Sequence, residues 1–198
     1  MPWWRAESYY KDSWHGTSKL DGGGALMNQA IHMIDILQYL MGPVESLQAY
    51  TAALANEIEV EDTAVAVLRF RSGTLGLIQG MTSSFPGQFR RLEITGTKGT
   101  VIQEENSFRI WQFADQSDRD TEIASRFGRI TGGGGVSDPA AIPFEPHARN
   151  IAVFLESVES GKPFMIDGPE ARKAVEIILG IYKSSREMKP FHFTLPHY

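Results

Sequence analysis

The sequence predicts an α+β domain with a mixed, mainly antiparallel β-sheet of roughly six to nine strands. Strand-like segments rich in β-branched residues follow one another at intervals of about ten residues. Short glycine-containing links separate them, which favours antiparallel pairing because parallel neighbours need long crossovers. Helical periodicity flanks this block on both sides. At 198 residues the chain is long enough for one domain with a full core, and short for two.

The strand predictions rest on composition and on turn signals. The segments TAVAVLRF and TLGLIQGM are separated only by RSG, which indicates a hairpin. LEITGTKGTVIQ repeats this pattern around two glycines. The expected strands are residues 46–53, 63–71, 74–83, 91–96, 100–104 and 108–113, with an edge strand in the tail 191–196.

Three helices are expected. The first lies within 21–42 and is followed by Pro43, the second spans 145–160 and ends at Gly161, and the third spans 169–188 with proline in its first turn. Residues 114–143 lack any periodicity, so they are expected to form a long irregular loop, which is usually functional or disordered.

The helix within 21–42 is apolar on almost every face, yet it carries polar residues in one narrow stripe. At about 100° per residue, Asn28, His32 and Asp35 share a side of the helix, and Gly24 continues that side toward the amino end. Buried polar groups are costly unless they are hydrogen-bonded, so the stripe is expected to face an internal partner or a ligand.

Three interpretations of this stripe stay open. His32 could be a core histidine held by neighbouring polar groups. It could instead exchange protons with a ligand, because histidine titrates near neutral pH and Gly24 would let a ligand approach the backbone closely. A metal site is the third option, although no second histidine four residues on supports it.

Large aromatic rings gather in the first fourteen residues without helical or strand periodicity. They include Trp3, Trp4 and Trp14, and they could stack on a sugar ring or pack against the sheet or an upstream domain. His15 is either near a cleft or simply exposed. Glu59, Glu61 and Asp62 are expected to form a solvated turn rather than an acid pair.

Composition excludes several classes of function. The absence of cysteine excludes disulfides and thiolate metal sites, and it is compatible with a cytoplasmic location. A net charge of −5 with scattered basic residues gives no footprint for nucleic acid or an anionic membrane. No apolar run reaches the roughly 18 residues of a membrane span, and neither Gly22–Gly24 nor the run 132–135 fits a dinucleotide fingerprint.

In order along the chain, WHGTSKLDGGGALMNQAIHMIDILQYLMG, RLEITGTKGTV and IDGPEARKAVEIILGIYKSSREMKP resemble the carboxy-terminal domain of the glucose-fructose oxidoreductase, inositol dehydrogenase and MocA family. The resemblance implies an open sheet with helices packed on one face, a dihydrodipicolinate-reductase-like fold. It implies that the other sheet face forms a homo-oligomer interface. It also implies that NAD or NADP is bound mainly by an amino-terminal Rossmann domain that is absent from residues 1–198.

By position, the resemblance makes His32 the catalytic residue that contacts the substrate hydroxyl. Asn28 falls where many members have aspartate, and an amide can orient a hydroxyl but cannot take its proton. Trp14, His15 and Gly24 are expected to line the substrate site, no metal is expected, and Asp35 is expected to be structural.

These inferences lead to one main expectation and two rivals. The chain is expected to be the substrate-binding half of an NAD(P)-dependent oxidoreductase acting on a secondary alcohol of a sugar, polyol or sugar derivative, and to be inactive alone. The rivals are a non-catalytic ligand sensor or scaffold of the same family, and a metal-dependent lyase or hydrolase.

Overall fold

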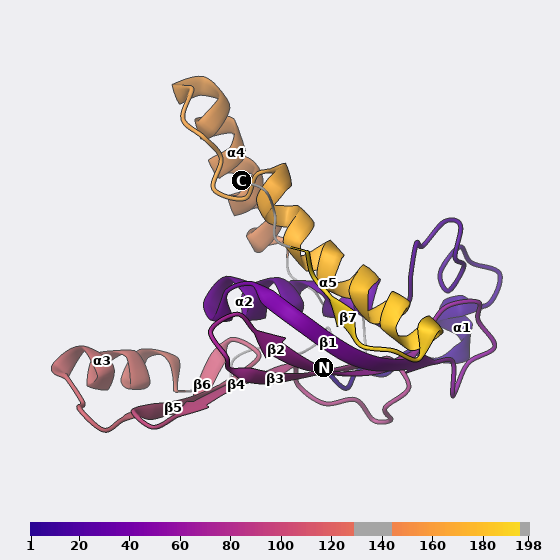
Figure 1. Ribbon diagram of the computed structural model, residues 1–198. Coiled ribbons are helices and arrows are strands. Elements are labelled where there is room, and N and C mark those ends of the chain that lie inside the picture. The colour runs from indigo at the N-terminus through magenta and orange to yellow at the C-terminus, as the bar shows by residue number, and fades with distance from the viewer. Residues whose placement is uncertain (129–143, 195–198) are drawn as a thin grey trace.

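The computed structural model describes residues 1–128 and 144–194, and it confirms the α+β class with antiparallel sheets. The described strands form two sheets, one of four strands in the order β3-β2-β1-β7 and one of three in the order β4-β5-β6 (Figure 1). Among the described residues the expected antiparallel sheet is divided in two, because β3 and β4 do not pair with each other.

The six predicted internal strands are all present, with ends shifted by at most two residues. The tail contributes a strand of two residues that pairs with the first strand. The strands are β1 (Val44–Ala52), β2 (Thr63–Phe70), β3 (Leu75–Met81), β4 (Arg91–Gly96), β5 (Gly99–Glu104), β6 (Ser107–Phe113) and β7 (Phe191–His192).

The predicted helices 145–160 and 169–188 are confirmed to within one residue at each end. The helix predicted within 21–42 is divided into two elements. Within 21–42 a π-helical turn precedes a regular helix. The helices are α1 (Glu7–Tyr10), η1 (Leu26–Ala30), α2 (Ile31–Met41), α3 (Asp118–Phe127), α4 (Glu145–Ser160) and α5 (Gly168–Glu187). Among the described helices, none is both long and apolar enough to cross a membrane.

Helix α3 corrects the loop expected at 114–143. It begins with a capping box, in which the Ser117 hydroxyl accepts a hydrogen bond from the Asp120 N–H while the Asp120 carboxylate accepts one from the Ser117 N–H. The indole N–H of Trp111 in β6 donates to the same carboxylate at 3.0 Å, which ties α3 to the second sheet. Residues 129–143 of the expected loop lie outside the described residues.

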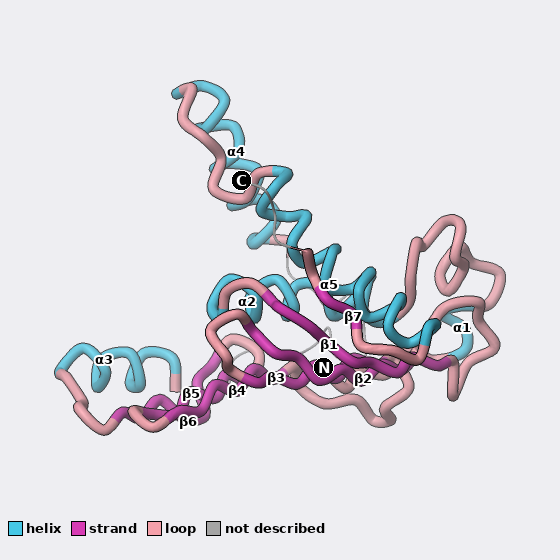
Figure 2. The backbone as a smooth tube through the Cα atoms, in the orientation of Figure 1, coloured by secondary structure: helices cyan, strands magenta, loops and turns pink. Residues whose placement is uncertain are grey.

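Helices α2 and α5 cover one face of the four-stranded sheet, as Figures 1 and 2 show. Strand β2 explains why: Ala64, Ala66, Leu68 and Phe70 are buried, whereas the residues between them are more exposed. This period of two directs one row of side chains toward the helices. The core there is completed by Leu26, Ile34, Ile178 and Ile181.

The opposite face of this sheet is apolar and open to solvent. It carries large hydrophobic side chains from three adjacent strands, and Val67 pairs directly with Leu77 while Tyr50 pairs with Val65. We call Tyr50, Val65, Val67, Leu75 and Leu77 the open sheet face; Val67 is 56% exposed and Leu77 is 63% exposed. Helix α4 likewise leaves apolar residues such as Phe154 exposed.

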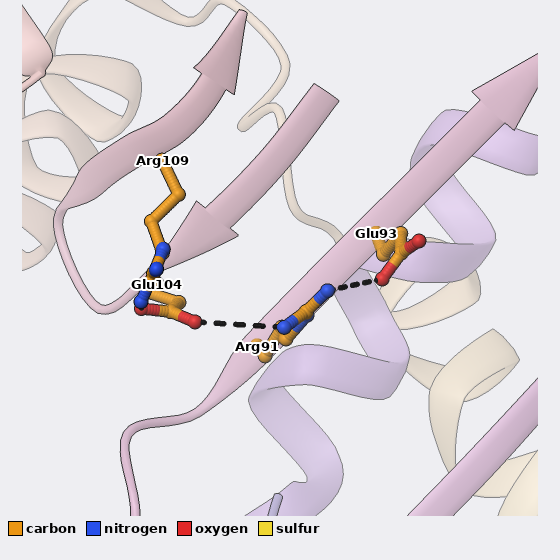
Figure 3. A network of polar contacts seen from close by, with 4 residues as sticks. All are labelled: Arg91, Glu93, Glu104 and Arg109. Atoms are coloured by element: carbon orange, nitrogen blue, oxygen red, sulfur yellow. Dashed lines mark hydrogen bonds and ion pairs between the residues drawn. The ribbon is translucent and has the colours of Figure 1, made fainter. Parts of the chain in front are cut away.

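The second sheet is crossed by a network of ion pairs. Arg91 contacts Glu93 at 2.6 Å within β4 and Glu104 of β5 at 3.7 Å (Figure 3). Arg109 of β6 reaches Glu104 from the other side at 3.3 Å. Because both arginines are well exposed, we expect the network to fix the strand register more than to add stability.

Candidate substrate site

The amino-terminal end of the helix formed by η1 and α2 is held by one buried acid, Glu61, which is 7% exposed. Its carboxylate accepts hydrogen bonds from the N–H groups of Gly24 at 3.0 Å and Leu26 at 2.9 Å, and its carbonyl oxygen accepts one from Ala25 at 2.9 Å. The first N–H groups of a helix have no partner within the helix, so Glu61 satisfies three of them from outside.

Glycine at position 24 has an internal reason. A side chain there would place its Cβ only 1.8 Å from the carbonyl oxygen of Glu61. The close approach expected at Gly24 is therefore made by the backbone of Glu61, and Gly24 itself is buried. Its contribution to substrate binding stays a prediction.

Tyr182 of α5 closes this arrangement by donating its hydroxyl hydrogen to Glu61 at 2.9 Å. Burial raises the pKa of Glu61, although its hydrogen bonds act in the opposite direction. Burial, with the nearby charge of Glu61, also raises the pKa of Tyr182 far above its ordinary value. The phenol thus stays a donor, and one hydrogen-bonded unit joins α5 to the helix start.

The neighbouring acid, Asp62, is fully buried and stabilises the loop after β1. It accepts hydrogen bonds from the backbone N–H groups of Leu54, Ala55 and Asn56 at 2.8 to 3.0 Å. Burial alone would raise the pKa of Asp62, but these bonds outweigh it and lower that pKa. The expectation of a solvated turn is wrong for Glu61 and Asp62, since both acids satisfy backbone donors inside the protein.

Asp21 connects two pieces of the predicted site. One carboxylate oxygen accepts a hydrogen bond from the Asn28 side-chain amide at 2.9 Å, and the other accepts one from the Gly16 N–H at 2.8 Å. Asn28 is half-buried and lies in η1. Asp21 therefore fixes the Asn28 amide beside the segment that contains Trp14 and His15, a link that the sequence alone does not indicate.

The aromatic residues before the helix form a stack. The rings of Trp14 and His15 lie 3.9 Å apart at 26°, and the Tyr9 ring lies 4.2 Å from His15 on the same segment. Ser13 Oγ and His15 Nδ1 are hydrogen-bonded at 2.6 Å. A pocket of about 460 Å³ adjoins His15 and Gly16, while Trp14 is half exposed.

His32 lies in the first turn of α2 and remains accessible to solvent. Partial burial of its ring lowers the pKa of His32, and the positive charges of Arg90 and His147 lower it further. Asp35 acts in the opposite direction. The imidazole is consequently neutral near pH 7 and able to accept a proton.

The predicted residues are thus only partly brought together. Trp14 stacks on His15, and Asp21 joins that segment to Asn28, but within residues 1–128 and 144–194 no hydrogen bond links His32 to Asn28. The π-helical turn at 26–30 explains part of this, because its i→i+5 bonding departs from the 100° spacing used to align the stripe.

The helix start does not fit a dinucleotide phosphate. Such groups bind to free N–H groups at a helix amino end, and here Glu61 already occupies those of Gly24 and Leu26 with a carboxylate. Nor does the described part of the chain bring together three histidine, aspartate or glutamate side chains that could hold a metal ion. The N–H groups at this helix start are therefore already used inside the protein.

Comparison with known proteins decides the family. Residues 1–102, just over half of the chain, match the GFO/IDH/MocA C-terminal domain. The chain belongs to this family. The family resemblance of the sequence is therefore confirmed.

Solved and curated relatives agree with this assignment. The WlbA dehydrogenase from Bordetella pertussis, solved with NADH and UDP-GlcNAcA, is 33% identical and covers 98% of this chain with a TM-score of 0.81. Myo-inositol 2-dehydrogenase from Thermotoga maritima is 28% identical over 84% of the chain. A levoglucosan dehydrogenase solved with NADH and levoglucosan, at 19% identity over 94% of the chain and a TM-score of 0.72, shares the fold.

The chain spans about half the length of these relatives. It covers 53% of the WlbA chain, 54% of the levoglucosan dehydrogenase chain and 48% of the inositol dehydrogenase. The relatives are dehydrogenases of sugars and polyols, and those solved in complex contain NADH.

Proposed function

We propose that the chain is the substrate-binding domain of an NAD(P)-dependent oxidoreductase that acts on a secondary alcohol of a sugar, polyol or sugar derivative. The observation that carries the proposal is the 33% identity, over 98% of the chain, to a dehydrogenase solved with NADH and a nucleotide sugar. The cofactor is held mainly by an amino-terminal Rossmann domain outside residues 1–198, consistent with a helix start already occupied by Glu61.

His32 is proposed to exchange the proton of the substrate hydroxyl. A bound nicotinamide would supply the hydride acceptor for the carbinol hydrogen of the substrate. The hydroxyl proton must leave at the same time, and a neutral imidazole with a lowered pKa is suited to take it at neutral pH. In the reverse direction the imidazolium returns that proton to the oxygen.

Asn28, Trp14, His15 and Gly24 are proposed to line the substrate site. The Asn28 amide is held through its N–H by Asp21, which leaves its carbonyl oxygen to accept from a sugar hydroxyl. The stacked rings of Trp14 and His15 offer a flat apolar surface to a sugar ring. A cytoplasmic location fits the cysteine-free sequence.

The test is the complete enzyme, with this chain joined to its native upstream region and screened against sugars and polyols with NAD and NADP. His32→Ala should lower kcat/KM by about 10²- to 10⁴-fold, the usual contribution of a general acid or base. Tyr39→Ala, an exposed change on the same helix, is the matched control and should leave activity unchanged. Undiminished activity in His32→Ala would remove His32 from the mechanism.

The same experiment separates the main rival. A protein that binds a sugar but shows no turnover with either cofactor would be a ligand sensor or scaffold of the family.

A further inference from the structure

The carboxylate of Asp21 makes one hydrogen bond with each of its oxygens. Oδ2 accepts the backbone N–H of Gly16 at 2.8 Å, and Oδ1 accepts the side-chain NH₂ of Asn28 at 2.9 Å. The N–H of Asp21 itself donates to the carbonyl oxygen of Thr17 at 3.0 Å, which sets where the carboxylate lies. A half-buried acid thus stands between the segment of stacked aromatic rings and the helix formed by η1 and α2.

The charge of Asp21 decides which end of the Asn28 amide faces it. A carboxylate can only accept hydrogen bonds, so the NH₂ group of Asn28 must point toward it. The opposite orientation would place the amide oxygen against a negatively charged oxygen. The backbone of Asn28 is fixed as well, because its N–H donates to the carbonyl oxygen of Gly24 at 3.0 Å. The carbonyl end of the Asn28 side chain therefore points away from Asp21.

The side-chain carbonyl oxygen of Asn28 is left as an acceptor. Within residues 1–128 and 144–194 no group donates a hydrogen bond to it, and the side chain is half-buried. Hydrogen bonds to charged groups are strong, and linked hydrogen bonds polarise one another. The negative charge of Asp21 is therefore felt on the far side of the amide, where it makes the carbonyl oxygen a stronger acceptor.

We propose that Asp21 is a positioning residue that fixes Asn28 as a hydrogen-bond acceptor, so that the site selects a substrate with a hydroxyl donor at this point. The proposal rests on the proposed function, because it takes Asn28 as a residue that contacts the sugar or polyol. Asp21 acts through the amide without touching the substrate. Its second bond holds it in place, because Gly16 is tightly packed: a Cβ there would lie 2.8 Å from Cγ2 of Ile58.

The near-isosteric variant Asp21→Asn should reverse the Asn28 amide. The Gly16 N–H needs an acceptor, so the single oxygen of the new amide would face Gly16 and its NH₂ would face Asn28. Asn28 would then turn its carbonyl oxygen toward position 21 and present its NH₂ group to the substrate. The number of hydrogen bonds inside the protein stays the same, so the urea midpoint of unfolding should change little while recognition changes.

Kinetics of the complete enzyme test this reversal with the sugar or polyol identified in the screen. Asp21→Asn should raise KM by about 10- to 100-fold, the value of one hydrogen bond to an oriented, polarised acceptor, and should leave kcat nearly unchanged. His32→Ala, by contrast, should lower kcat.

A double variant provides the rescue. Asp21→Asn combined with Asn28→Asp should bring KM back to near its original value. The carboxylate at position 28 then accepts the NH₂ of position 21 with one oxygen and the substrate hydroxyl with the other. Asn28→Asp alone should not do so, because two carboxylates would face each other. Glu59→Gln is the matched control: this exposed carboxylate also accepts two hydrogen bonds, both from Ser18 at 2.9 Å, and its loss should leave KM unchanged.

NMR measures the orientation of the amide without turnover. In residues 1–198 labelled with ¹⁵N-asparagine, the side-chain NH₂ protons of Asn28 should move upfield in Asp21→Asn, because they lose their bond to a charged oxygen. They should stay in place in Glu59→Gln.

A raised KM in Asp21→Asn, its recovery in the double variant and the shifted Asn28 resonance support the proposal. An active enzyme in which Asp21→Asn leaves KM unchanged overturns it, as does a folded double variant no better than Asp21→Asn, or an Asn28 resonance that does not move. No turnover of any sugar or polyol, together with a shifted resonance, would reject the proposed function and support the orientation of Asn28 by Asp21.

Discussion

At the scale of single residues, Glu61 has the largest set of structural roles in the site. Its carboxylate and carbonyl satisfy three helix N–H groups, receive the Tyr182 hydroxyl and require glycine at position 24. A hydrogen bond left unmade in such a buried position costs more than the same bond contributes when formed.

Glu61→Gln should therefore lower the free energy of unfolding by about 1–3 kcal/mol, because the amide NH₂ replaces one of two acceptor oxygens and faces a backbone N–H. Urea unfolding measures this. Glu57→Gln, an exposed change in the same loop, is the control. Equal stability of Glu61→Gln and the unchanged chain would contradict the role assigned to this carboxylate.

The two neighbouring acids should give opposite dependences of stability on pH. The pKa of Asp62 is lowered in the folded state, so its contribution is present above the unfolded pKa and is lost as the pH falls through the folded value. The pKa of Glu61 is raised, so its contribution is present below the unfolded pKa and is lost as the pH rises through the folded value.

Asp62→Asn should accordingly destabilise the chain at neutral pH and lose this difference in acid. Urea unfolding of both chains between about pH 3 and pH 7 measures the effect. A constant difference across that range would show that the charge of Asp62 does not matter.

The lowered pKa of His32 gives a prediction that can be measured without turnover. Removing a positive charge by Arg90→Ala should raise the pKa of His32 toward its ordinary value of about 6.5. An NMR titration of the imidazole in residues 1–198 measures it, with Arg109→Ala in β6 as the control. In the complete enzyme, the acid limb of kcat/KM for alcohol oxidation should move to higher pH in the same variant.

At the scale of elements, strands and helices bounded by turns are predictable from the sequence, whereas polar contacts made by loop side chains are not. Strand β4 was predicted with its observed ends, because glycine and alternation mark both sides. Glu61 looks solvated in the sequence because its partner Tyr182 comes from a distant helix, and Asp62 because the loop that folds its carboxylate onto the backbone of residues 54–56 has no periodic pattern. Asn28 was found, but Asp21 was missed because sequence spacing does not show that it also reaches Gly16.

Helix α3 was missed although a local signal exists, since Ser117 and Asp120 have the spacing of a capping box. Asp120→Ala should remove the carboxylate half of the capping box and the bond from Trp111, while the Ser117 hydroxyl keeps its bond to the N–H of residue 120. Amide exchange within residues 118–127 should then become faster and the Trp111 fluorescence should change. Asp115→Ala, outside the helix, serves as the control; an unchanged exchange pattern in Asp120→Ala would contradict the capping role.

At the scale of the whole molecule, one side of the four-stranded sheet is covered by helices and the other is bare. Open faces of this kind usually meet another protein surface. We propose that the open sheet face pairs two copies of the chain, as the family resemblance implied.

Val67→Glu, at the middle strand of the open sheet face, should weaken that association at least tenfold, because it places a charge in an apolar contact. Sedimentation of the complete protein over a range of concentrations measures it. Glu45→Gln, an exposed change near the start of β1, is the control. A protein that sediments as a monomer without any substitution would refute the interface.

Opposite ends of the described chain cover part of each border of the four-stranded sheet: β7 pairs with β1, and residues 1–4 form isolated bridges at the end of β3. Trimming either end would expose a bare strand border, which pairs readily with other chains. Shortened versions of this domain should therefore aggregate before they lose their helices. The placement of the ends makes solubility, rather than helix content, the sensitive indicator of where the domain has been cut.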